Sequence, residues 1–198
     1  NSPSAMILPT SRLDMIEEAN DYYFPTLTGV YLKVTRTLIT IATVFFTPLY
    51  LLFMQNQQWL PEAFAFVAVR DTVNIPLIFQ FLLLELSIDG LRLAAMNTPT
   101  MLSTPLSVIA GIVMGEFSVQ SGWFNSEVML YMAFVAVANY TQPNFELGYA
   151  LKFMRLELLV LTAVFNWIGF LAGTVIVICS ICFNNTLSGR SYLNIRLN

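Results

Sequence analysis

The sequence LELLVLTAVFNWIGFLAGTVIVICSICF, residues 156–183, is the longest of five apolar segments in this chain and decides its fold class. Its one charged residue is Glu157, and a bilayer core is crossed by about 20 apolar residues in a helix. We therefore predict a membrane-spanning helix here. The tetrapeptide Asn166-Trp167-Ile168-Gly169 is a soft point within it, that is, a place where the helix is less stable and can bend.

Four further apolar segments precede it, at residues 34–54, 75–95, 105–119 and 127–142. The first would be about 31 Å long as a helix, which matches the hydrocarbon core, and Pro48 predicts a kink in it. We predict an all-α, polytopic transmembrane helix bundle with kinked or broken helices. Its transmembrane domain covers 34–183, after a polar and amphipathic juxtamembrane segment at 1–33 and before a polar tail at 184–198.

The composition supports a membrane protein. Of the 198 residues, 57% are hydrophobic and only 11% are charged, and the mean hydropathy is +0.68, whereas soluble domains carry roughly twice that charge. The net charge of −3 is small and no basic patch exists, which argues against nucleic acid as a partner. The chain begins Asn-Ser-Pro-Ser, so we expect no signal peptide and a piece of a longer or processed protein.

The residues of common active sites are absent. The chain has no histidine, P-loop or GxGxxG motif, which excludes a Ser-His-Asp or Cys-His arrangement. Its two cysteines, Cys179 and Cys182, have the spacing of a redox or metal pair, but they lie in an apolar run and are better read as small buried hydrophobes. We predict no enzyme activity, no cofactor and no metal site.

The basic residues predict the orientation. With five spans and a cytoplasmic N-terminus, six fall on the inner side and three outside, as the positive-inside rule favours. The inner set is Arg12, Lys33, Arg36, Arg92, Lys152 and Arg155, and the outer set is Arg70, Arg190 and Arg196. A re-entrant segment at 75–95, or a hairpin within 156–183, would instead return the tail to the cytoplasm.

The most informative residues are charged ones inside the segment 75–95. Glu85, Asp89 and Arg92 are spaced four and then three residues apart, so they share one helical face. Each costs about 2.5–3.5 kcal/mol at the centre of a membrane helix, so this face cannot meet lipid. It is either a structural ion pair within the helix or, as we favour, a polar wall along an ion or solute path.

Three further polar residues are candidates for the same path. Glu116 lies near the end of its segment, close enough to reach the headgroups instead. Glu146 follows Pro143 and equally suits the free end of a broken helix, and Asn139 suits a hydrogen bond between helices. Gly111 and Gly115 form a small-residue face that favours close packing of two helices.

Taken in order, several stretches resemble the A-subunit family of spore germinant receptors. They are Ile75-Pro76, LELSIDGLR at 84–92, GIVMG at 111–115, PNFELG at 143–148, and Lys152 with Arg155. A second set resembles one sporulation branch of that family: NTPT at 97–100, Gly115-Glu116, EVMLY at 127–131 and Tyr192-Leu193. The likeness runs from about 30 to 195.

The resemblance implies a germination protein of the bacterial spore inner membrane. It also implies a ring-shaped homo-oligomer that conducts ions when germination is triggered, with the lipid bilayer and other germination membrane subunits as partners. Two features depart from the family. Only about 30 residues precede the membrane part, where members carry a sizeable soluble region, and Asn97 stands where the nearest branch suggests histidine. The alternatives are a secondary transporter of a small solute or ion and a non-conducting assembly scaffold.

Overall fold

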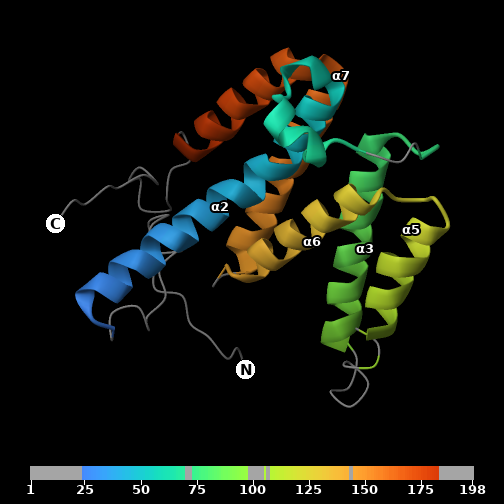
Figure 1. The fold of residues 1–198 in the computed structure, drawn as a ribbon. Helices are drawn as coiled ribbons and strands as arrows, with labels where there is room; N and C mark the ends of the chain where they lie inside the picture. The colour runs from blue at the N-terminus through green and yellow to red at the C-terminus, as the bar shows by residue number, and fades with distance from the viewer. Residues whose placement is uncertain (1–23, 70–72, 98–104, 106–107, 143–144, 183–198) are drawn as a thin grey trace.

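The structure is a computed structural model that describes residues 24–69, 73–97, 105, 108–142 and 145–182. All regular elements in these ranges are helical, which confirms the predicted all-α class for this part of the chain. The principal helices are α2 (Thr26–Gln55), α3 (Leu77–Asn97), α6 (Ser126–Tyr140) and α7 (Phe145–Cys182) (Figure 1). The shorter ones are η2 (Gln57–Trp59), η3 (Glu62–Val67), the π-helical η4 (Ile112–Phe117) and α5 (Ser118–Gln120), which continues from η4. Residues 1–23 of the juxtamembrane segment and the tail at 184–198 lie outside the described residues.

Two stretches of helix, Thr26–Gln55 and Glu146–Cys182, are long and apolar enough to cross a membrane by their length and composition. Two shorter apolar helices cover Val108–Gln120 and Ser126–Tyr140. Helix α3 is continuous from Leu77 to Asn97, but its apolar sequence is interrupted by the charged residues Glu85, Asp89 and Arg92. The full five-span bundle therefore stays a prediction.

Helix α2 lies at the centre and packs against α6 and α7. Its buried face carries small residues, among them Thr40, Thr43 and Thr47, with Pro48 inside the helix. The hydroxyls of Thr40 and Thr43 donate to the carbonyl oxygens of Arg36 and Ile39, each at 2.8 Å. Because their own helix satisfies these hydroxyls, the threonines leave a narrow face that lets α6 and α7 approach closely.

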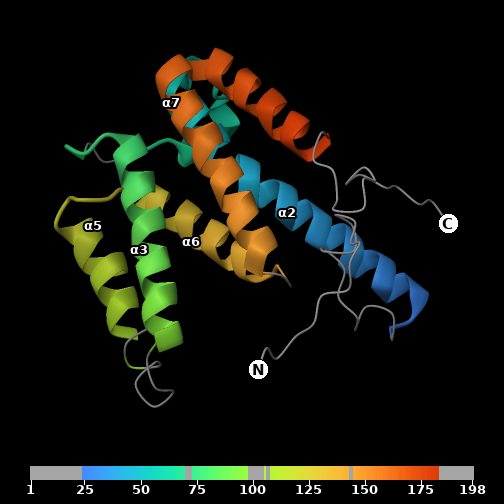
Figure 2. The ribbon, with the colours of Figure 1, turned by 180° about the vertical axis from the view of Figure 1, so that it is seen from behind.

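Helix α7 folds back on itself at Asn166, inside the predicted soft point. The backbone there is non-helical, with φ 54° and ψ −133°, and divides the helix into arms at 145–165 and 167–182. A Cβ built on Gly169 would lie 1.9 Å from the carbonyl oxygen of Leu161, so only glycine fits at this approach. Figures 1 and 2 show the second arm turning away from the first and running alongside α2. The reversal falls within the segment where the sequence left a hairpin open as an alternative, and the side of the membrane on which the tail lies stays a prediction.

Two asparagine side chains hold this turn in place through reciprocal hydrogen bonds. Asn56, just after α2, donates to the side-chain oxygen of Asn166 at 2.5 Å, and Asn166 donates back at 3.2 Å. The end of α2 thus holds the corner of α7.

Helix α7 also begins earlier than the predicted segment. Residues 145–155, expected in a loop because of their charges, form its first turns. The reason is the helical spacing of Leu147, Leu151 and Leu158, which are buried against α2 with Val44 and Val177. A second core joins α2, α3, α6 and α7, made of Tyr50, Leu51, Phe81, Leu84, Phe124, Val128, Met132 and Leu159.

Candidate functional site

The charged face of α3 turns inward, toward α7. The buried positions of α3 are Gln80, Phe81, Leu84 and Glu85, which recur at helical spacing and so form one face. Glu85 is only 6% exposed, and Asp89 follows it by one turn at a half-buried position. The acidic side chains therefore lie within the bundle.

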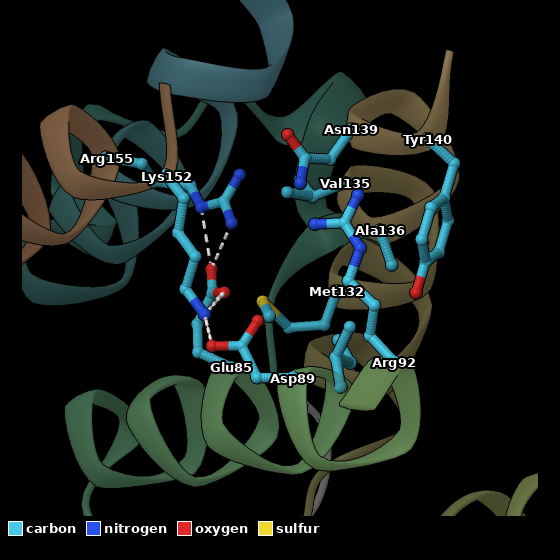
Figure 3. Close-up of a pocket in the computed structure, with 11 residues that line it drawn as sticks. Glu85, Asp89, Arg92, Met132, Val135, Ala136, Asn139, Tyr140, Lys152 and Arg155 are labelled. Carbon is cyan, nitrogen blue, oxygen red and sulfur yellow. Dashed lines mark hydrogen bonds and ion pairs between the residues drawn. The ribbon is translucent and has the colours of Figure 1, made fainter. Parts of the chain in front are cut away.

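Both carboxylates form ion pairs with basic side chains of α7 (Figure 3). Arg155 donates from Nε and Nη2 to Oε1 of Glu85, at 2.7 and 2.5 Å. Lys152 forms an ion pair with Asp89 and lies 3.6 Å from Oε2 of Glu85. We call Glu85, Asp89, Lys152 and Arg155 the buried ion-pair network.

Arg155 extends the network to a third helix. Its Nη1 donates to the backbone carbonyl of Thr43 in α2 at 3.1 Å, and the residue is 3% exposed. That carbonyl lies four residues before Thr47 and five before Pro48, in the part of α2 that packs on α7. One guanidinium thus connects α2, α3 and α7.

Arg92 lies beside the network. Its guanidinium carbon is 5.1 Å from the ring centre of Tyr140 and 5.2 Å from that of Tyr149, within the range of a cation–π contact. The sequence suggested that Arg92 neutralises the two carboxylates along its own helix. In the structure, Lys152 and Arg155 on α7 supply that neutralisation across the bundle.

A small cavity of about 10 Å³ lies among these side chains, bordered also by Met132, Val135 and Asn139 (Figure 3). This volume suits about one water molecule. The side-chain oxygen of Asn139 is buried there and makes no hydrogen bond within the described part of the chain. A Cβ added on Gly148 of α7 would lie 3.5 Å from that oxygen, an ordinary van der Waals contact, so Asn139 packs over α7 at this position.

The charges in this region nearly cancel. Glu85 and Asp89 contribute −2, Lys152 and Arg155 contribute +2, and Arg92 adds +1. A buried network of this kind requires each partner, since removing one leaves an uncompensated charge inside the protein. The arrangement therefore holds helices together and offers no net negative charge to a passing cation.

The other candidates lie apart from the network. Glu116 is exposed on η4 and accepts a hydrogen bond from Nε2 of Gln120 at 3.1 Å. Glu146 is exposed in the first turn of α7, where a carboxylate suits the positive end of the helix dipole. A Cβ built on Gly111 or Gly115 meets no atom within 4 Å, so neither glycine packs against a helix of the described chain.

Sequence reasoning missed Lys152 and Arg155 as members of the site. Both were counted as loop charges on the inner side, yet they are buried in α7 and paired. Their spacing with Leu151 and Leu158 on one helical face was the signal that could have placed them. Without these two, the six-to-three count of basic residues falls to four against three. Within the described ranges, no three metal-ligating side chains gather in one place.

Comparisons with known proteins agree with the resemblance seen in the sequence. The profile described as "Bacillus/Clostridium GerA spore germination protein" matches residues 1–197. Stage V sporulation protein AF of Bacillus subtilis (strain 168) is 34% identical over 89% of this chain and 36% of its own length.

Two more distant relatives come from the same bacterium. Spore germination protein A1 is 25% identical over 89% of the chain and 37% of its own length. The uncharacterized membrane protein YfkQ is 22% identical over 92% of the chain and 36% of its own length. The chain thus spans little more than a third of these relatives, and no solved structure matches it. The chain belongs to the GerA family of spore germination proteins.

Proposed function

We propose that this chain is a membrane subunit of a spore germination complex that assembles into an oligomer and conducts ions. Membership of the GerA family supports the role in germination. The names of two relatives, a spore germination protein and a membrane protein, support both the process and the location. The bacterial spore inner membrane is the location that we propose.

The observation that carries the membrane location is the inverted distribution of polarity on α3. Glu85 is buried, whereas the next residue, Leu86, is 70% exposed, and Leu83 and Leu93 are exposed as well. Water would favour the opposite arrangement, because it solvates charge and excludes apolar surface. Lipid favours this one, with apolar side chains outward and ionised groups paired inside.

The structure changes which residue we propose for an ion path. Glu85 and Asp89 are held by Lys152 and Arg155, so they offer little attraction to a cation. Glu116 is exposed on an apolar helix, and its described contact is a hydrogen bond from a neutral amide. We therefore propose that the helix Val108–Gln120 faces the axis of the oligomer and that Glu116 contributes to a ring of carboxylates along the path.

The test is the cation flux from liposomes, normalised to assembled protein. Glu116→Gln should lower the flux by roughly tenfold at low salt and by less at high salt, since a carboxylate ring concentrates cations and salt screens it. The control is Glu157→Gln, an exposed carboxylate on α7 that we place outside the path. Unchanged cation flux in Glu116→Gln would show that Glu116 does not line the path. A wild-type protein that assembles but conducts no cations would instead favour the alternative of a non-conducting assembly scaffold.

A further inference from the structure

A second, larger cavity of about 150 Å³ lies between α2 and α7. Both arms of α7 border it, because Met154 belongs to the first arm and Val177 to the second. Its full lining is Thr40, Ile41, Val44, Phe45, Met154, Val177, Ile178 and Ile181. It is distinct from the buried ion-pair network, with which it shares no lining residue.

The lining offers nothing to water. Its one polar side chain is Thr40, whose hydroxyl already donates to the carbonyl of Arg36 at 2.8 Å and accepts from Nε2 of Gln142 at 3.1 Å. A buried water needs two to four polar partners, and apolar cavities of about this size stay dry and take up apolar molecules. The chemistry of the site is therefore that of a hydrocarbon.

The second arm of α7, which borders the cavity, is fixed at its start. Asn166 is hydrogen-bonded to Asn56, and Gly169 is pressed against the backbone of Leu161. From this corner the arm runs alongside α2, as both views show (Figures 1 and 2). If the space between the two helices stayed empty, the side chains that line it would lose dispersion contacts. A bound apolar molecule would restore those contacts.

The mouth of the cavity indicates which guest fills it. Ile41 on α2 and Ile178 on α7 border the cavity and are 52% and 51% exposed, so it opens onto the outer apolar faces of these helices. In a bilayer those faces meet acyl chains. We propose that this cavity binds a segment of one acyl chain of a membrane phospholipid, since its volume holds only a few methylene groups. The inference rests on the proposed membrane location.

The experiment uses the protein in phosphatidylcholine vesicles that contain a photoreactive diazirine in the acyl chain. Labelled residues are identified by mass spectrometry. Met154, within the cavity, should be labelled, and so should Val160, which is exposed on the outer face of α7. Val177→Phe, which fills the cavity, should reduce labelling of Met154 at least fivefold and leave Val160 unchanged.

Two further variants keep the test decisive. Ile181→Phe fills the same cavity from one turn further on, in case Val177→Phe does not assemble. Val175→Phe adds the same bulk at an exposed position outside the lining and should label like the wild type. Labelling of Val160 without Met154, or of Met154 unaltered in both filling variants, would overturn the acyl-chain site alone. Absence of label at Val160 as well would show that lipid does not surround the chain, and both proposals would then fail.

Discussion

Arg155→Met is the substitution that most sharply probes the buried ion-pair network. Methionine keeps much of the length of the side chain but removes three contacts, two to Glu85 and one to the carbonyl of Thr43. Glu85 is then left with Lys152 at 3.6 Å, and Lys152 already serves Asp89.

Removing one partner of a buried ion pair costs roughly 3–5 kcal/mol, because the other charge stays in a medium that solvates it poorly. We expect Arg155→Met to lie in that range. The double variant Glu85→Met with Arg155→Met removes the pair as a whole and leaves Lys152 with Asp89. Its cost should be below about 2 kcal/mol, since an apolar pair replaces a buried ionic one with little loss.

The assay is reversible unfolding of the purified protein in mixed micelles, titrated with a denaturing detergent. Glu157→Gln serves as the control, because this exposed carboxylate lies two residues from Arg155 on the same helix, and it should change stability by no more than about 0.5 kcal/mol. Single variants that each cost less than about 1 kcal/mol and simply add in the double variant would refute the coupling between α3 and α7.

Three further predictions concern assembly, the fold of α7 and the topology. Replacing Gly111 and Gly115 with leucine should abolish the oligomer on native mass measurement while leaving the folded protomer intact, because a Cβ added at either glycine meets no atom within 4 Å in the described part of the chain; an unchanged oligomer would contradict this. Gly169→Ala should force the arms of α7 apart, since its Cβ would overlap a backbone oxygen, and an unchanged distance between spin labels on the two arms would show otherwise. Cysteines introduced near Trp59 and near Trp123 should both be labelled from the outer side, and labelling of either from the cytoplasm would exclude the five-span topology.

The sequence predicted the features that depend on local composition. Each apolar segment overlaps a helix, and the soft point at Asn166 is the corner of α7. The inward direction of Glu85 followed from the cost of placing a charge in lipid.

The partner of Glu85 could not be predicted in the same way. Nothing local relates Glu85 to Arg155, which is 70 residues away. The sequence shows charges between two apolar segments, and that pattern usually indicates a loop. Only the packing of α7 on α2 and α3 brings Lys152 and Arg155 inside. Likewise, the apolar cavity between α2 and α7 depends on the turn at Asn166, which composition alone does not specify.

The central claim is that this chain forms the conducting ring of a germination complex, with Glu116 toward its axis and Glu85 locked within each protomer. Electron cryo-microscopy of the purified assembly in lipid tests it most directly. We expect a closed symmetric ring, the helix Val108–Gln120 lining a polar axis, and Arg155 on Glu85 in every subunit. A protein without a closed ring, or a ring whose axis is lined by Glu85 and Asp89 freed from Lys152 and Arg155, would contradict the account.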